Sequence, residues 1–299
     1  MERARLQAQS VLYQTDKAAL ERALEALVNA LRVERETERL LGQVTLVWGD
    51  ASPEPLFTEA ELARLRRGCG ELLTLEYRFF DRNTGSALGH DLLAQNAEAE
   101  LLLILNPDVL LAPRSLVLLH RALREPDTAL AEARQTPLEH PKSYDEKSLE
   151  TPWASTACAL LRAEAFRAVG GFDSESFFLY GDDVDLSWRL RLAGWRLRYC
   201  PEAPVFHPKR LSREGRWEAT AAEQRYAAEC ALLLAWKYSR PKRLRALLQQ
   251  YAEGGEAERR AVRSFLQRRA EGRLPRPLDA DRRVASFEGW TYSPMRYGY

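Results

Sequence analysis

Strand-like and helix-like runs alternate along the first half of the chain, and this alternation constrains the fold more than any other feature. A helical run starts at Thr15 or Asp16, either of which is a natural N-cap. Strands are expected over residues 6–14, 43–48, 72–80, 101–106 and near 128–135. The run from Leu101 is apolar up to Asn106, which is typical of a strand buried on both faces. The pattern predicts an α/β protein: a mostly parallel sheet with helices on both faces.

Polar residues follow three of these strands, at the edge where such sheets bind ligands. Asp50 ends the second strand, Asn83 and Gly85 follow the third, and residues 106–108 (Asn-Pro-Asp) follow the fourth. Each is also an ordinary turn residue, so turn formation is the alternative reading of each one. Their presence at three strand ends favours one shared crevice.

Two adjacent acids, Asp182 and Asp183, stand directly before a helical run. In that run Val184, Trp188 and Leu192 form one apolar stripe, which predicts a helix with one buried side. Acids at a helix start can cap free N–H groups and interact with the helix dipole. Capping would explain the pair, and catalysis is the alternative.

The second half of the chain divides into a further strand-like run and a helical extension. The run over residues 196–209 contains His207, one of four histidines. Beyond it, residues 211–299 are expected to be helical with an irregular tail. Residues 237–276 hold 12 Lys and Arg against 4 Asp and Glu, a net charge of +8, so the remainder of the chain carries −7. This basic face could contact anionic membrane, or it could be a solvated face whose apolar side packs on the rest of the protein.

Composition narrows the class of protein. With 29% charged residues and a formal net charge of +1, the chain is typical of a soluble globular protein and has no global attraction to nucleic acid. The four cysteines form no CxxC pair, so we expect reduced, buried thiols. No signal peptide or run of about 18 apolar residues is apparent, so a cytoplasmic protein, peripheral at most to the inner face of the membrane, is expected.

Three stretches taken together carry a family resemblance. They are NTGSALGHD, LLLILNPDVLLAP and the long segment TPWASTACALLRAEAFRAVGGFDSESFFLYGDDVDLSWRLRLAGWRLRYCPEAPVFH. In this order they resemble glycosyltransferase family 2, with the GT-A fold, and in particular bacterial rhamnosyltransferase-like enzymes. The resemblance covers residues 6–209. It implies a catalytic domain over residues 1–210, with a nucleotide-sugar-binding half over about 1–110 and an acceptor and catalytic half over 111–210.

The resemblance also implies roles for individual residues. Asp183 corresponds to the catalytic base, and Asp182 is its neighbour in the acidic pair. A divalent cation, Mg²⁺ or Mn²⁺, would be held by Asp108 and His207. The donor would be contacted by Tyr13, Asp50, Asn83, Gly85, Asp91, Asn106 and Asp108.

The chemistry of glycosyl transfer agrees with these residue types. A base must take a proton from the acceptor hydroxyl, and charge must stabilise the leaving nucleoside diphosphate. One carboxylate base opposite the leaving group implies direct displacement with inversion. The expected function is therefore transfer of a sugar from a nucleotide donor, dTDP-rhamnose by resemblance, to a hydroxyl of lipopolysaccharide or another bacterial surface glycan.

Several positions depart from the family pattern. Asp182 stands where the family has Glu, Asn106 replaces an acid, Ala51 replaces Asn, and Thr156 replaces Gly. His90 and Asp91 replace an Asn-Asn pair. The changes at Asn106 and Ala51 favour the alternative of a nucleotide-sugar-binding or scaffold protein with weak catalysis. A nucleotidyltransferase would show a glycine-rich, basic N-terminal loop, which VLYQTDKAAL lacks.

Overall fold

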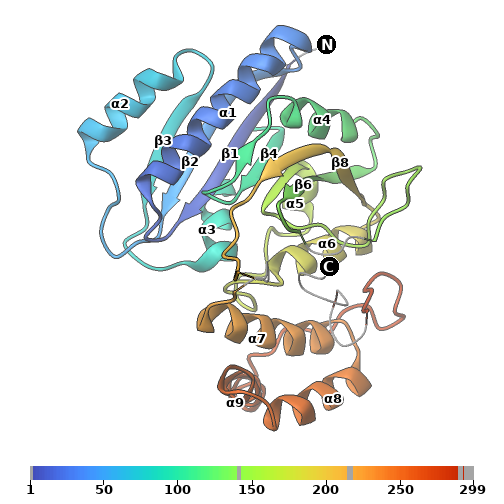
Figure 1. Ribbon diagram of the computed structural model, residues 1–299. Helices are drawn as coiled ribbons and strands as arrows, with labels where there is room; N and C mark the ends of the chain where they lie inside the picture. Colours follow the sequence, from blue (N-terminus) through green and yellow to red (C-terminus); the bar gives the residue numbers. More distant parts are fainter. Residues whose placement is uncertain (1–2, 140–142, 214–217, 289–291, 293–299) are drawn as a thin grey trace.

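In the computed structural model, which describes residues 3–139, 143–213, 218–288 and 292, eight strands form one sheet in the order β3-β2-β1-β4-β7-β6-β8-β5 (Figure 1). The strands are β1 (Ala4–Leu12), β2 (Leu41–Asp50), β3 (Thr74–Phe79), β4 (Leu101–Leu105), β5 (Leu110–Leu111), β6 (Thr128–Thr136), β7 (Cys158–Arg162) and β8 (Arg196–Phe206). The helices are α1 (Lys17–Thr37), α2 (Glu59–Cys69), α3 (Gly85–Ala94), α4 (Ser115–Ala122), α5 (Ala163–Ala168), α6 (Asp182–Leu192), α7 (Ala221–Lys237), α8 (Pro241–Ala252) and α9 (Glu256–Ala270).

Strand direction determines which strand ends meet. Strands β1 to β4 are parallel to one another, whereas β7 is antiparallel to both β4 and β6. Strand β8 is parallel to β6, so β6 and β8 run in the same direction as β4. The carboxyl ends of β4, β6 and β8 therefore lie at one edge of the sheet, and the predicted mixed, mostly parallel sheet is confirmed.

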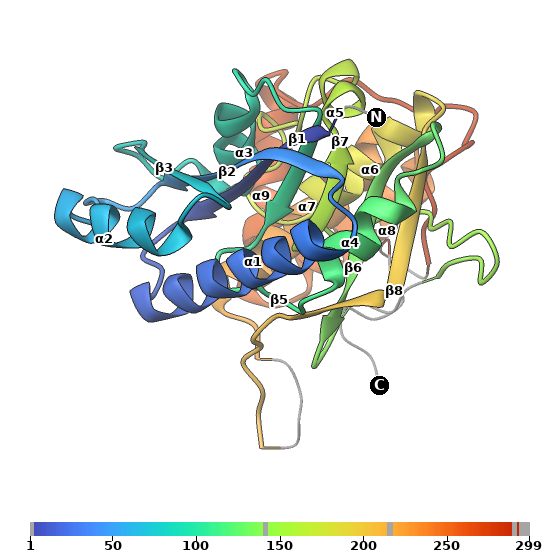
Figure 2. The ribbon, with the colours of Figure 1, turned by 90° about the horizontal axis from the view of Figure 1, so that it is seen from above.

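Strand β4 is buried on both faces, as its apolar sequence predicts. Leu101, Leu103 and Leu105 pack in the cluster that includes α1, α2 and α4. Leu102 and Ile104 face the opposite cluster, with α3, α5 and α6. Burial of each such side chain stabilises the fold by roughly 1.5–3 kcal/mol relative to exposure. Seen from above, the helices cover both faces of the sheet (Figure 2).

The first predicted helix begins as its sequence indicates. Asp16 is the N-cap of α1, and its carboxylate accepts a hydrogen bond of 2.8 Å from the Ala19 N–H group. All four cysteines are buried thiols, as expected.

The C-terminal helices pack on helix α6. Val184 and Trp188 are fully buried against this helical segment, and Trp188 meets Tyr238 edge to face at 4.6 Å between ring centroids. Leu186 and Leu190 on the opposite side of α6 are equally buried against the sheet. The expectation of one buried side was therefore too narrow: α6 lies between the sheet and the C-terminal helices.

A buried ion-pair network also joins α7 to α6. The Lys237 ammonium group lies 2.6 Å from both Asp173 and Asp185, and Asp185 also accepts a hydrogen bond of 2.7 Å from Arg189. Lys237 is 5% exposed and Asp185 is fully buried. Removing one member would leave an uncompensated buried charge, which strongly destabilises a fold. Lys237 is therefore part of the core and contributes nothing to the basic surface in which the sequence placed it.

None of the helices in the described ranges combines the length and apolar character needed to cross a membrane.

Candidate active site

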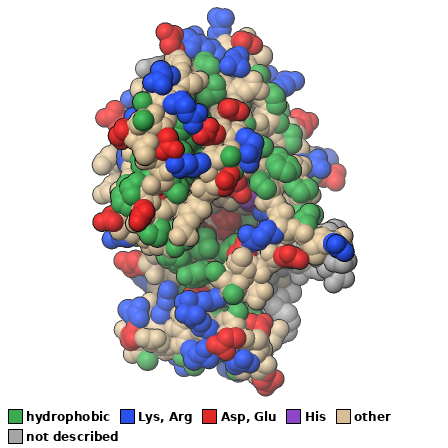
Figure 3. All heavy atoms as spheres, turned by 60° about the vertical axis from the view of Figure 1, so that its left-hand side comes forward, with side chains coloured by type: hydrophobic (Ala, Val, Ile, Leu, Met, Phe, Trp, Pro, Cys, Tyr) green, Lys and Arg blue, Asp and Glu red, His purple; other side chains and the backbone are tan. Residues whose placement is uncertain are grey.

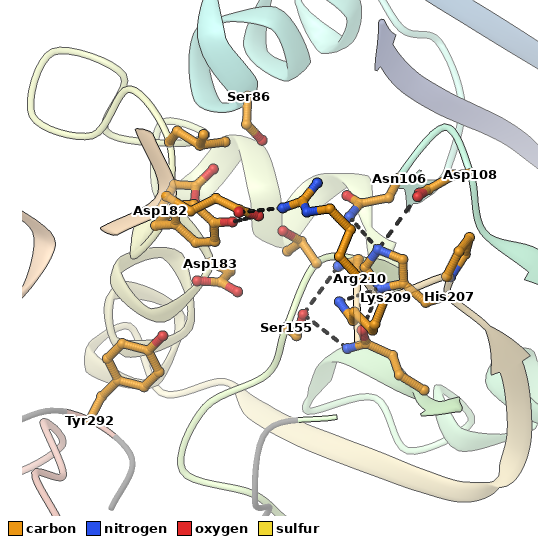
Figure 4. Close-up of a pocket in the computed structure, with 17 residues that line it drawn as sticks. Ser86, Asn106, Asp108, Ser155, Asp182, Asp183, His207, Lys209, Arg210 and Tyr292 are labelled. Atoms are coloured by element: carbon orange, nitrogen blue, oxygen red, sulfur yellow. Dashed lines mark hydrogen bonds and ion pairs between the residues drawn. The ribbon is translucent and has the colours of Figure 1, made fainter. Parts of the chain in front are cut away.

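A cavity of about 490 Å³ lies at the carboxyl edge of the sheet (Figure 4). Asp182 and Asp183 lie on one side of it, and Asn106, Asp108 and His207 lie on the other. These five are half of the residues that the sequence predicted for the site. The volume is within the range of small-molecule sites, about 300–1,000 Å³.

The acidic side of the cavity is the first turn of α6. Gly181 is the N-cap residue with a φ of +75°, and a Cβ atom there would lie 2.1 Å from the Cys230 sulfur, so only glycine fits. Neither acid is the N-cap residue, because Asp182 and Asp183 are the first two residues of the helix. Asp183 Oδ1 accepts a hydrogen bond of 2.8 Å from the Val184 N–H group. The positive end of the helix dipole favours the ionised form of a carboxyl group here.

The two acids have different surroundings. Asp182 is 5% exposed. Burial, and then the neighbouring charge of Asp183, raise the pKa of Asp182 to about 7, while a hydrogen bond with Ser86 opposes the rise. The buried member of the pair therefore retains a proton close to neutral pH.

This raised pKa predicts a pH-dependent stability. A carboxyl group that binds its proton more tightly in the folded state costs the fold free energy as pH rises from its unfolded pKa of about 4 to its folded pKa of about 7. Asp182→Asn removes that cost. We expect the free energy of unfolding of the variant, minus that of the wild type, to be on the order of 2–3 kcal/mol larger at about pH 8 than at about pH 5. Denaturant titrations at the two pH values measure this difference, and an equal difference at both would contradict the assignment.

The opposite side of the cavity holds a histidine oriented by a glutamine. His207 Nδ1 lies 2.7 Å from Gln135 Oε1, which is an acceptor, so Nδ1 donates and the lone pair is on Nε2. That Nε2 lies 3.2 Å from Asn106 Nδ2 and 3.6 Å from Asp108 Oδ1. Burial, followed by the charge of Lys209, lowers the pKa of His207 to about 3, so the ring is neutral.

This donor set fits a divalent cation. His207 Nε2, which carries the lone pair of a neutral imidazole, lies 3.6 Å from the carboxylate oxygen of Asp108, and Gln135 fixes the tautomer as partners of metal-binding histidines do. In the part of the chain that the structure describes, no three His, Cys, Asp or Glu side chains cluster as metal ligands. Asp108 and His207 could therefore hold a cation only with further ligands from substrate and water, which is the usual mode of Mg²⁺.

Two cations follow His207 and also line the cavity. Lys209 Nζ lies 3.1 Å from His207 Nδ1; because both nitrogens carry hydrogen in this tautomer, the contact adds positive charge and is not a hydrogen bond. Arg210 extends across the cavity and pairs with Glu223 (Figure 4). Glu223 lies in the first turn of α7 and accepts a hydrogen bond of 2.8 Å from the Tyr180 hydroxyl. Helix α7 thereby contacts the turn that carries the two acids.

The remaining five predicted residues do not line the cavity. Asp50 is fully buried at the end of β2, and it accepts hydrogen bonds from the backbone N–H groups of Ser52 and Leu56 and from the Tyr77 hydroxyl. It therefore shapes the loop after β2. Tyr13, at the end of the neighbouring strand β1, is 48% exposed.

Asn83, Gly85 and Asp91 support neighbouring loops. Asn83 accepts a hydrogen bond of 3.1 Å from the Gly85 N–H group, and a Cβ atom on Gly85 would lie 2.3 Å from the Phe178 carbonyl oxygen. This turn therefore packs on the loop that leads to Asp182. Asp91 accepts a hydrogen bond of 2.8 Å from the Phe172 N–H group, and burial raises its pKa to about 6.

Several cavity residues had no place in the sequence prediction. Gln135 could have been found, because it stands at the end of a predicted strand, and so could Lys209 and Arg210, which follow His207 after one proline. Tyr292 has no local signal, because its place at the cavity rests on a contact with Trp153, which is distant in the sequence. The residues missed are Ser86, Gln135, Ser155, Tyr180, Lys209, Arg210, Glu223 and Tyr292.

Comparison with known sequences agrees with the resemblance. Residues 142–269 match the family described as glycosyl transferase family group 2. An N-acetylglucosaminyl-diphospho-decaprenol L-rhamnosyltransferase of Mycobacterium tuberculosis is 44% identical over 82 residues, which are 27% of this chain and 24% of that protein. The rhamnosyltransferase WbbL of Escherichia coli is 37% identical over 67 residues, 22% of this chain and 25% of that protein. The chain thus spans about a quarter of the length of these curated relatives.

Comparison with solved structures agrees with the fold. A mannosyltransferase from Pyrobaculum calidifontis, solved with GDP-Man and Mn²⁺, matches 92% of this chain and 81% of its own with a TM-score of 0.57 and 17% identity. GalNAc-T7, solved with UDP, GalNAc and Mn²⁺, matches 92% of this chain and 55% of its own with a TM-score of 0.61 and 13% identity. The predicted GT-A fold and the resemblance to bacterial family 2 glycosyltransferases of the rhamnosyltransferase type are confirmed.

Proposed function

We propose that this chain transfers a sugar from a nucleoside-diphosphate donor to an acceptor hydroxyl, with inversion at the anomeric carbon. One observation carries the proposal: a single cavity is lined on one side by Asp183 and on the other by Asp108 and His207. Base and leaving-group site therefore lie opposite each other, as in-line displacement of a diphosphate requires.

Asp183 is the proposed base. It stands at a helix N-terminus, which keeps a carboxylate ionised and ready to accept a proton from the acceptor hydroxyl. Asp182, which retains a proton near neutral pH, would leave only one negative charge in the pair. Two charges at this point would repel the donor diphosphate.

The leaving diphosphate would bind at the opposite wall. Asp108 and His207 would hold Mg²⁺ or Mn²⁺, and such an ion neutralises charge that develops on phosphate oxygens. Lys209 and Arg210 line the same cavity and would add fixed positive charge. The nucleoside would extend along the carboxyl edge toward Asp50 and Tyr13, where the exposed tyrosine ring offers a surface for a base to stack on.

The names of the relatives suggest the substrates. Both are rhamnosyltransferases, and one name specifies a decaprenyl diphosphate acceptor. We therefore propose a rhamnosyl donor such as dTDP-rhamnose and a lipid-linked precursor of a bacterial surface glycan, such as lipopolysaccharide, as acceptor.

A panel of nucleotide sugars tests this function. With Mn²⁺ present, the correct donor should raise the melting temperature, and the shift should shrink when EDTA is added. Release of nucleoside diphosphate should then depend on an acceptor, for which octyl β-N-acetylglucosaminide is a suitable probe. Donor binding without any acceptor-dependent release would instead support a binding or scaffold protein, the reading that Asn106 and Ala51 favour.

A lipid-linked acceptor requires work at a membrane surface, and the C-terminal helices offer a basic one. Six of their basic side chains are exposed: Lys242, Arg245, Arg259, Arg260, Arg263 and Arg269. Arg245 and Arg269 also line a groove with Leu244, Leu248 and Trp236, so positive charge and apolar surface occur together. Figure 3 shows basic side chains gathered on the lower part of that face, where the C-terminal helices lie.

We expect salt-sensitive binding to anionic vesicles as a result. Each basic residue near an anionic surface contributes about 1 kcal/mol, so replacing Lys242, Arg245, Arg260, Arg263 and Arg269 by Gln should abolish cosedimentation. Lys237 stays unchanged because it is part of the core. Activity on a soluble acceptor should be retained. Failure of the wild type to bind anionic vesicles at low salt would favour a solvated face.

A further inference from the structure

We infer that Tyr292, which packs on the buried Trp153, forms a wall of the acceptor subsite and binds one face of the acceptor sugar. This inference rests on the proposed function and extends it, because the tail has no role in that proposal so far. It follows from how the tail is fixed, from where Tyr292 lies and from the chemistry of the residues around it.

The tail beyond α9 is fixed to the C-terminal helices by hydrogen bonds. The carboxylate of Asp279 accepts from the backbone N–H groups of Arg283, Val284 and Ala285, which makes a compact turn. Arg240 donates to the Ala285 carbonyl oxygen at 2.9 Å. These hydrogen bonds fix residues 279–285 against the N-terminus of α8.

The same tail is fixed to the helix that begins with the acids. Arg191, in the last turn of α6, donates to the Val284 carbonyl oxygen at 2.8 Å and lies 3.4 Å from the Pro152 carbonyl oxygen. Phe287 packs on Trp188 of the same helix, with ring centroids 5.0 Å apart. Helix α6 therefore positions the acids at one end and the tail at the other.

Tyr292 follows this anchor and reaches the cavity. Its ring meets Trp153 edge to face, at 4.9 Å between centroids and 77° between planes. Trp153 is 3% exposed, so it is a rigid support for the tyrosine ring. In Figure 4 Tyr292 lies on the side of Asp183, away from Asp108 and His207.

This position fits an acceptor sugar. The donor diphosphate belongs opposite the base, so the acceptor hydroxyl must approach on the side of Asp183, where Tyr292 stands. A tyrosine presents a flat apolar ring and a polar hydroxyl, which match the C–H face and the hydroxyl groups of a pyranose. The Trp153 contact holds Tyr292 at the wall, so the cavity stays open beside it.

Steady-state kinetics of Tyr292→Ala test the inference, with octyl β-N-acetylglucosaminide as the acceptor probe. We expect the acceptor KM to rise about 10-fold or more, the scale of losing a good side-chain contact. The donor KM should change less than about 2-fold, because the donor binds on the other side. Tyr292→Phe should retain most of the acceptor affinity. Tyr144→Ala is the matched control, since it removes a ring that packs at a tilt on Tyr199 and does not line the cavity.

Each other outcome overturns a stated part of the account. If the wild type transfers sugar and Tyr292→Ala keeps its acceptor KM, the subsite is wrong and the proposed function stands. A lower acceptor KM would show that Tyr292 blocks the site. If Tyr292→Ala shows no melting transition, the variant is unfolded and Tyr292→Leu is tested in its place. An unchanged acceptor KM in Tyr292→Leu would also overturn the subsite. Absence of transfer by the wild type overturns the function on which the inference rests.

Discussion

Asp183→Asn should reduce sugar transfer at least ~100-fold while donor affinity changes little. Asparagine has nearly the shape of aspartate but cannot accept the proton of the acceptor hydroxyl. The Val184 N–H group can still donate to the side-chain oxygen, so the first turn of α6 should be retained. Transfer is measured as nucleoside diphosphate released in the presence of acceptor, and donor affinity is measured by calorimetry.

Asp182→Asn is the matched comparison for this experiment. It changes the neighbouring carboxyl group, which is buried and is not the proposed base. The loss of transfer should be clearly smaller than for Asp183→Asn. Near-normal turnover in Asp183→Asn, or a larger loss in Asp182→Asn, would overturn the assignment of the base.

Asp108→Ala should weaken nucleoside diphosphate binding at least ~10-fold and make the residual binding insensitive to EDTA. Mutation of a residue that only hydrogen-bonds to a metal ligand lowers metal affinity 10–100-fold, and mutation of a direct ligand should lower it at least as much. His207→Ala should have the smaller effect, because Asp108 supplies the negative charge. Isothermal calorimetry with UDP and dTDP, with Mn²⁺ and with EDTA, measures both variants.

The matched control for this pair is Asp91→Asn. Asp91 was predicted to contact the donor, but its carboxylate accepts a hydrogen bond from the Phe172 N–H group and does not line the cavity. Nucleoside diphosphate binding should therefore keep its metal dependence in that variant. Binding that is unchanged by EDTA, by Asp108→Ala and by His207→Ala would exclude the cation site.

The sequence predicts the elements whose patterns are local. Strand β4 is apolar throughout, and α1 carries its cap at Asp16, so both appear as expected. Strand β7 was not predicted, because β7 and α5 together are rich in Ala, Leu, Arg and Glu, which favour helices. The chain also passes from β7 directly into α5 without a turn. Pairing with β4 and β6 on both edges overrides this helical tendency. Helix α2 was missed although Thr58 and Glu61 form a capping box at its start.

The site divides in the same way. Asp108, Asp183 and His207, which stand at the ends of predicted elements, line one cavity as the sequence led us to expect, and their roles stay predictions. Which strand ends meet depends on strand direction, and the unpredicted β7 lies between β4 and β6 in the sheet, antiparallel to both, so that β4 and β6 run in the same direction. Tyr292 lies at the cavity through a long-range contact with Trp153, which no local pattern encodes.

Proton removal by one carboxylate, opposite the leaving diphosphate, is the central claim, and the stereochemistry of the product tests it most directly. The wild-type protein, Mn²⁺, a nucleotide sugar that it binds and a soluble acceptor should yield one nucleoside diphosphate for each glycoside formed. Proton NMR of the glycoside should show an anomeric configuration opposite to that of the donor. Retention of configuration, or donor binding without any glycoside, would contradict the account.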